Sequence, residues 1–239
     1  MEHGLNSEPF RIQYSCLIRV SSVALLFVGD IRIIMKVPEH IACSFLLAQL
    51  GIYQQYGWSG TALMIAAGCL PDLDGIGIIA GWRFYRRYHR ILGHGLPITV
   101  LGPLALAGFG SWILGVGSFL VLWPWLQVSL LLHLFTDVSF YNWPVQLAWP
   151  LSKRGWAGGL LTWNDLVPTV LLYGGVASVF AWPEKRMWVA FASILATATY
   201  LAWRALRPRR TSTWEVWLAG GWTERSPRFC RWLTGDFVT

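Results

Sequence analysis

Leu70-Pro71-Asp72-Leu73-Asp74-Gly75 opens a polar stretch, which a basic, aromatic turn joins to His89-Arg90-Ile91-Leu92-Gly93-His94-Gly95-Leu96-Pro97. Two carboxylates and two imidazoles therefore lie within one loop's reach, between strongly apolar segments. The whole chain has only 12 acidic residues and 5 histidines. Acids and histidines are costly near hydrocarbon unless they pair or bind something. The clustering predicts a metal site at the edge of a membrane.

The composition around this stretch is that of an integral membrane protein. Of the 239 residues, 55% are hydrophobic and only 13% are charged, whereas a soluble domain has about 25% charged residues. Sixteen tryptophans fit the same class, because Trp favours the lipid–water interface. Open strands cannot satisfy their backbone in lipid. We therefore predict an all-α fold, a polytopic membrane helix bundle of about six helices in the lipid bilayer.

The net charge and the cysteines argue against a nucleic-acid-binding protein, a disulfide-stabilised fold and a cysteine-ligated zinc site. A net charge of +7 would suggest nucleic acid in a soluble protein, but lysines and arginines in cytoplasmic loops explain it better, and we expect no nucleic-acid partner. The four cysteines are far apart and form no CxxC. This pattern predicts neither a disulfide framework nor a thiolate zinc site.

Three parts of the chain differ in character. Residues 1–34 form an N-terminal extension whose apolar run, 20–28, is too short to span a membrane, and we expect translation to start at Met35. Residues 35–206 form the predicted membrane helical domain with the metal site. Residues 207–239 form a basic, Trp-rich C-terminal tail.

Six apolar runs are predicted as helices, with a Gly-rich turn at 111–117: they are residues 41–53, 58–70, 96–114, 117–135, 166–182 and 187–203. If the chain crosses at each run, every histidine after residue 3 lies on one face. The acids between Glu39 and Asp165 lie there too. Most lysines and arginines near the spans also fall on this face, so the positive-inside rule puts it in the cytoplasm.

His133 and Asp137 form an HxxxD motif. On a helix, positions i and i+4 share a face, so the imidazole and the carboxylate point the same way and suit a divalent ion such as zinc. The alternative is a histidine that is hydrogen-bonded to its own aspartate in a helix bundle. The motif lies at the end of an apolar run, close to the other polar motifs, which favours metal ligation.

Asp72 and Asp74 form a DxD motif between Pro71 and Gly75, which predicts a helix end followed by a tight turn. Both carboxylates can then point into one pocket, either as metal ligands or as an acid–base pair without metal. The alternative is a solvated, capped helix end. His94, just before Pro97, can face back over Asp72.

His89 and Arg90 are candidates for catalytic roles beside the DxD carboxylates. His89 is a second ligand or a proton donor, and the Arg90 fork suits an anionic substrate such as a phosphate. For Arg90, as for the arginines at 83, 86 and 87, the alternative is a topology and headgroup anchor.

The complete candidate set also includes His40 at the start of the first helix. The predicted metal ligands are His40, Asp72, Asp74, His94, His133 and Asp137. The predicted catalytic residues are Asp74, His89 and Arg90. Such a set holds between one and three zinc ions, with a water as nucleophile. Asp165 is expected to cap the fifth helix, with metal ligation as the alternative.

Taken together, these motifs resemble the bacterial inner-membrane family of membrane-bound, metal-dependent hydrolases, which includes a LexA-regulated member. The pattern there is an early His, a (P)DxD, an HR-x-x-x-H element and a late HxxxD, followed by an aromatic stretch that ends in Trp-Pro. The match here covers about residues 35–152, including Trp149-Pro150. One departure is Gly95, where the family has Ser.

This resemblance, and a more distant one to the zinc phospholipase C and P1 nuclease group, implies hydrolysis of a phosphoester or lipid substrate with zinc at the bacterial inner (cytoplasmic) membrane. The rival is a non-enzymatic membrane protein whose cluster binds or transports ions or protons. A transporter would place its polar groups near mid-bilayer on broken helices, whereas here they gather at one face. A remnant that binds nothing is a third alternative. The oligomeric state is left open.

Overall fold

The computed structural model describes residues 37–81, 84–85, 88–139, 144–158, 160–161 and 165–206. Residues Glu39–Thr239 form one unit, separate from Met1–Pro38, and this larger unit contains all the candidate site residues. The predicted N-terminal extension, the Met35 start, the C-terminal tail and the arginines at 83, 86 and 87 lie outside the described residues. Those expectations stay predictions.

Helices dominate the described part, which confirms the all-α prediction. The α-helices are α2 (Val37–Ala48), α3 (Ile52–Cys69), α5 (Leu96–Gly108), α6 (Phe119–Ser139), α7 (Leu166–Ala181) and α8 (Arg186–Leu206). Shorter helical segments are the 3₁₀ helix η1 (Pro71–Ala80), the π-helical turn η2 (Phe109–Ile113) and η3 (Pro183–Lys185). Between α6 and α7 the described backbone includes an isolated antiparallel bridge between Val145 and Trp156.

Three of these helical segments are long and apolar enough to cross a membrane, namely Leu96–Ile113, Phe119–Ser139 and Pro183–Leu206. The helices α2 and α7 are apolar but shorter. Pro103 and Pro124 lie inside α5 and α6, which membrane helices tolerate because neighbouring groups satisfy the freed backbone. As predicted, Asp165 caps α7, and its side chain accepts a hydrogen bond from the Val167 backbone N–H at 3.3 Å.

The first two predicted helices have wrong boundaries. The apolar run 41–53 is broken, because α2 ends at Ala48 and α3 begins at Ile52. The turn between them is buried: Gln49 is 0% exposed, and a Cβ on Gly51 would lie 2.9 Å from the Trp125 ring. The turn is short, Gln49 to Gly51, and apolar residues follow and precede it directly, so the sequence reads as one run. Gly57, at φ 57° and ψ −142°, kinks α3 further along.

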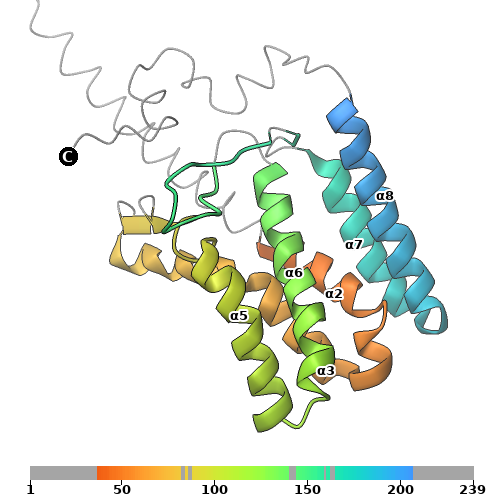
Figure 1. Ribbon diagram of the computed structural model, residues 1–239. Coiled ribbons are helices and arrows are strands. Elements are labelled where there is room, and N and C mark those ends of the chain that lie inside the picture. Colours follow the sequence, from red (N-terminus) through yellow and green to blue (C-terminus); the bar gives the residue numbers. More distant parts are fainter. Residues whose placement is uncertain are drawn as a thin grey trace, which may run out of the picture. The chain divides into compact units, whose positions relative to one another are not determined.

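Two apolar cores lie on either side of α2. One joins α2 to α3, α5 and α6 through residues such as Leu47, Met64 and Leu126. The other joins α2 to α7 and α8 through residues such as Leu46 and Leu172. Figure 1 shows α3, α5 and α6 together and α7 and α8 as a pair beside them. This packing brings the start of α2 and the end of α6 into one region.

Candidate metal centre

The predicted site residues come from four places in the chain that the fold brings together. His40 lies in the first turn of α2, Asp72 and Asp74 lie at the start of η1, and His133 and Asp137 lie in the last two turns of α6. The remaining three, His89, Arg90 and His94, lie in the turn that precedes α5. The structure therefore unites histidines that are up to 93 positions apart, from His40 to His133.

Four of these residues form a compact donor group. One ligand atom from each of Asp72, His94, His133 and Asp137 lies within 4.8 Å of all the others. His94 Nε2 is 3.0 Å from Asp137 Oδ2 and 3.3 Å from His133 Nε2, and Asp72 Oδ1 is 3.8 Å from His133 Nε2. Donors about 2.0–2.1 Å from a tetrahedral zinc ion are about 3.3 Å apart. These spacings bracket that value, so the residues fit one divalent ion.

The outward-facing Nδ1 atoms of His133 and His94 face oxygen atoms of other residues, closely for His133 and at longer range for His94. His133 Nδ1 is 2.6 Å from the Gly68 carbonyl oxygen, and His94 Nδ1 is 3.5 Å from Asp74 Oδ2. Metal-binding histidines characteristically donate their second N–H to a carbonyl or carboxylate, which fixes the ring and the tautomer. The Nε2 atoms are thus left to face the donor group.

His40 lies beside the donor group as a fifth candidate. Its Nε2 is 3.4 Å from Asp137 Oδ1 and 4.0 Å from Asp72 Oδ2. Its ring stacks on that of His133, with centroids 3.7 Å apart, and its Nδ1 is 3.3 Å from the Thr136 hydroxyl oxygen. As in His94 and His133, the Nε2 atom of His40 faces the donor group and its Nδ1 atom faces another polar group.

Asp74 is turned towards the polypeptide that precedes α5. Its Oδ1 is 2.6 Å from His89 Nδ1, and its Oδ2 accepts hydrogen bonds from the backbone N–H groups of Arg90 and Gly93, both at 3.1 Å. Burial raises the pKa of Asp74, but the hydrogen bonds and charges of His89 and His94 outweigh it and hold the pKa well below its usual range. These contacts favour a positioning role for Asp74 over ligation.

The electrostatics of the site favour a cation. Burial lowers the pKa of His94, but the hydrogen bonds and negative charges of Asp137 and Asp74 outweigh it and raise the pKa to about 9. Among the described residues of the site, three carboxylates, from Asp72, Asp74 and Asp137, face one guanidinium, from Arg90. Even with His94 protonated, the three carboxylates outnumber the cationic side chains of Arg90 and His94, so the formal charge of these five groups is negative.

Arg90 is a buried member of the site, with 3% of its surface exposed. Its guanidinium Nη2 donates a hydrogen bond to Asp137 Oδ1 at 3.0 Å. Its φ of 65° lies in the left-handed region that non-glycine residues rarely adopt, and its carbonyl accepts a hydrogen bond from the Gln146 N–H at 3.2 Å. This burial argues against a headgroup anchor at Arg90.

Three contributors escape the sequence-based predictions. Gly68 acts through a backbone carbonyl, which no side-chain motif reveals, and Thr136 lies inside the HxxxD motif as an unnoticed partner of His40. Tyr85 stacks on His89 with centroids 4.5 Å apart. The departure at Gly95 has a steric reason, because a Cβ there would lie 2.9 Å from the Ile91 carbonyl oxygen and 3.0 Å from that of Trp149.

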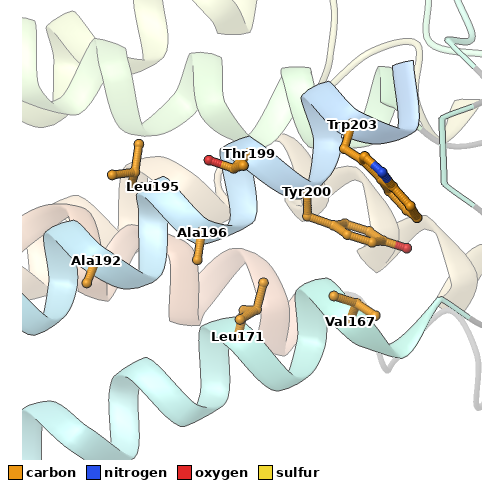
Figure 2. A pocket seen from close by; sticks show the side chains of 8 residues that line it. All are labelled: Val167, Leu171, Ala192, Leu195, Ala196, Thr199, Tyr200 and Trp203. Carbon is orange, nitrogen blue, oxygen red and sulfur yellow. The ribbon is translucent and has the colours of Figure 1, made fainter. Parts of the chain in front are cut away.

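A separate shallow groove runs between α7 and α8. Figure 2 shows its lining, which includes Val167 and Leu171 from α7 and Leu195 from α8. The lining is apolar apart from Thr199 and Tyr200, and the Tyr200 hydroxyl donates to Asp165 at 2.7 Å. The groove contains none of the metal-ligating residue types and is not part of the centre.

Helices that can cross a membrane, with a buried His/Asp cluster of metal-binding spacing at their ends, define a membrane protein with a candidate metal centre. The chain belongs to the YdjM inner membrane protein family, whose model matches residues 35–210. It is also similar to the uncharacterized protein YfhP of Bacillus subtilis (strain 168), at 26% identity over 118 residues. That match covers 49% of this chain and 35% of YfhP, so the chain spans about a third of that relative's length. No solved structure matches.

Proposed function

We propose that this protein is a membrane-bound metal-dependent hydrolase that acts on a phosphoester or lipid substrate, with its site at the cytoplasmic face. The observation that carries the proposal is the donor group of Asp72, His94, His133 and Asp137, whose ligand atoms lie within 4.8 Å of one another. Imidazole nitrogens paired with carboxylates favour zinc over magnesium or calcium, which prefer oxygen donors.

The residues of this chain take distinct roles in the proposal. Asp72, His94, His133 and Asp137 hold the ion, and His40 is a further donor or a proton acceptor beside them. A divalent ion bound at such a site acts as a Lewis acid and lowers the pKa of water towards 7. Asp72, with 14% of its side chain exposed, is the most accessible of the four. Substrate therefore approaches from the Asp72 side.

The other polar residues hold this arrangement in place. Asp74 fixes the turn before α5 by accepting hydrogen bonds from two backbone N–H groups, and its Oδ2 lies 3.5 Å from His94 Nδ1. His89 pairs with Asp74, and Arg90 pairs with Asp137. In this proposal Arg90 positions the metal ligand Asp137. The alternative role for Arg90 is contact with a substrate anion, because a guanidinium can bind a phosphate through two hydrogen bonds.

The rival function, ion or proton binding without catalysis, would use the same cluster. The donors lie in the first turn of α2, at the start of η1, before α5 and in the last turns of α6. They gather at helix ends, whereas ion pathways place their polar groups near mid-bilayer. This position favours chemistry at the membrane surface.

A turnover assay on detergent-purified protein tests the proposal. The protein is stripped with a chelator, resupplied with zinc, and given p-nitrophenyl phosphate, bis(p-nitrophenyl) phosphate and phosphatidic acid in mixed micelles. We expect zinc-dependent hydrolysis of at least one probe, lowered about a hundredfold by Asp137→Asn and unchanged by Glu184→Gln, an exposed position in η3. Zinc-loaded protein that hydrolyses none of the three, but passes zinc or protons when reconstituted in vesicles, would instead establish the rival.

A further inference from the structure

An apolar row lies on the outer side of η1, next to the metal centre. Leu73, Ile76 and Ile79 are 55%, 61% and 85% exposed. A 3₁₀ helix has three residues per turn, so side chains at i, i+3 and i+6 stand on one face. We call these three side chains the η1 stripe. In the described part of the chain, more than half of the surface of each of these side chains is exposed.

The inner side of the same helix faces the protein. Asp74 is held by the backbone of Arg90 and Gly93, and a Cβ on Gly77 would lie 3.0 Å from the Phe84 ring. One short helix therefore directs its carboxylates towards the protein and the hydrophobic side chains of the stripe away from it. Such a division is typical of segments that lie in the plane of a membrane interface.

The hydrogen bonds of Asp74 fix how deep η1 lies. Asp74 Oδ2 is 3.1 Å from the Gly93 nitrogen, and the membrane-spanning segment Leu96–Ile113 begins only three residues after Gly93. Consecutive Cα atoms are about 3.8 Å apart, so this connection covers about 11 Å at most. In the view of Figure 1, η1 (gold) runs crosswise to α5 and α6. The helix is tied to the level at which α5 enters the membrane.

We propose that the η1 stripe inserts into the acyl region of the leaflet in which α5 begins, which anchors the Asp72 side of the metal centre at the headgroup level. The occupant of this surface is the bilayer lipid. The sequence has arginines at 83, 86 and 87 directly after η1, and clustered basic residues at a membrane surface bind anionic headgroups.

The anchor itself does not depend on catalysis, but its consequence for substrate class rests on the proposed function. A site held at headgroup level receives esters carried by membrane lipids in preference to soluble ones. The tail of such a lipid would lie along Leu73 and Ile76, and its headgroup would lie at Asp72.

Site-specific fluorescence in vesicles tests the anchor without any activity measurement. In a background with Cys16, Cys43, Cys69 and Cys230 replaced by alanine, Ile79→Cys is labelled with the environment-sensitive dye NBD. The protein is reconstituted in phosphatidylcholine–phosphatidylglycerol vesicles and quenched by shallow doxyl-labelled lipid or by aqueous iodide. A cooperative thermal unfolding transition verifies that each variant is folded.

Three further positions serve as references. Leu195→Cys lies on the span that includes α8, Lys153→Cys lies in an exposed connection, and Ala80→Cys is exposed on η1 but off the stripe. We expect iodide quenching at position 79 to be about fivefold or more below that at 153. Quenching by the shallow doxyl lipid at 79 should equal or exceed that at 195, which lies midway along its span, and position 80 should be intermediate. Iodide quenching at 79 equal to that at 153, with no lipid quenching, would overturn the anchor and leave the hydrolase proposal standing.

Discussion

Gly68→Ala is a one-methyl change that tests how the fold sets the metal centre. Gly68 lies near the end of α3, where this helix meets α2 and α6. A Cβ there would lie 1.8 Å from the Ser44 hydroxyl oxygen, 2.9 Å from that of Ser129 and 3.0 Å from Ser44 Cβ. Rotating the Ser44 hydroxyl removes only the first of these contacts. The backbone at Gly68 must therefore move.

The carbonyl of Gly68 is what makes this movement matter for function. It is 2.6 Å from His133 Nδ1, so a backbone shift lengthens the hydrogen bond that orients the ligand. Losing such an outer partner lowers metal affinity about 10- to 100-fold, which equals about 1.4–2.8 kcal/mol. The extra methyl group itself destabilises a packed interior by about 1–3 kcal/mol.

Competition between the purified protein and a fluorescent chelator for zinc measures the affinity, and thermal unfolding measures the stability. Gly174→Ala is the matched control, because a Cβ at Gly174 meets nothing within 4 Å. Adding Ser44→Ala to Gly68→Ala removes the 1.8 Å clash but keeps the 3.0 Å one between Cβ atoms, so we expect partial recovery of both properties. Wild-type zinc affinity in folded Gly68→Ala protein would refute the role of this carbonyl.

Three other substitutions separate the roles of the polar residues. Asp74→Asn places an amide where the carboxylate accepts backbone N–H groups and the His89 proton, so we expect about tenfold weaker zinc binding by chelator competition; an unchanged affinity would contradict a positioning role. Arg90→Ala leaves Asp137 without its cation and destabilises the metal-free protein by about 3 kcal/mol or more. Because zinc then replaces the lost charge, the zinc-induced rise in Tm should exceed that of the wild type, and an equal or smaller rise counts against this role of Arg90. Asp165→Ala removes the α7 cap and costs about 1–2 kcal/mol of stability with zinc content unchanged, whereas lost zinc would place Asp165 in the site.

The helical part of the fold was predictable from the sequence where polarity changes sharply. The runs that became α5 to α8 have clear polar or Gly-rich ends, such as Gly115 and Gly117, which adopt positive φ in the structure. The turn after α2 was missed because it is only three residues long, Gln49 to Gly51, between two apolar segments. Gln49 is buried with its amide donating to the Phe45 carbonyl, and a single polar residue and a glycine do not distinguish such a buried turn from a continuous helix.

The site was predictable to the extent that it depends on side-chain type and local spacing. The HxxxD pair needed only the i, i+4 rule, and the DxD pair needed only the helix end before it. Two features required the three-dimensional structure. The turn of Asp74 towards the Gly93 backbone, and the burial of Arg90 on Asp137, depend on contacts between distant segments. Sequence spacing carries no information on such contacts.

The zinc content of the purified protein decides whether the His/Asp cluster is a metal centre. Detergent-purified wild-type protein and the double variant Asp72→Ala, His133→Ala are each exposed to zinc, washed, and measured by elemental analysis, with Glu184→Gln as a control outside the site. We expect about one zinc ion or more per wild-type chain, the same for the control, and near-complete loss in the double variant. Wild-type protein that stays metal-free after gentle purification and zinc resupply, while folded by thermal unfolding, would contradict a metal centre.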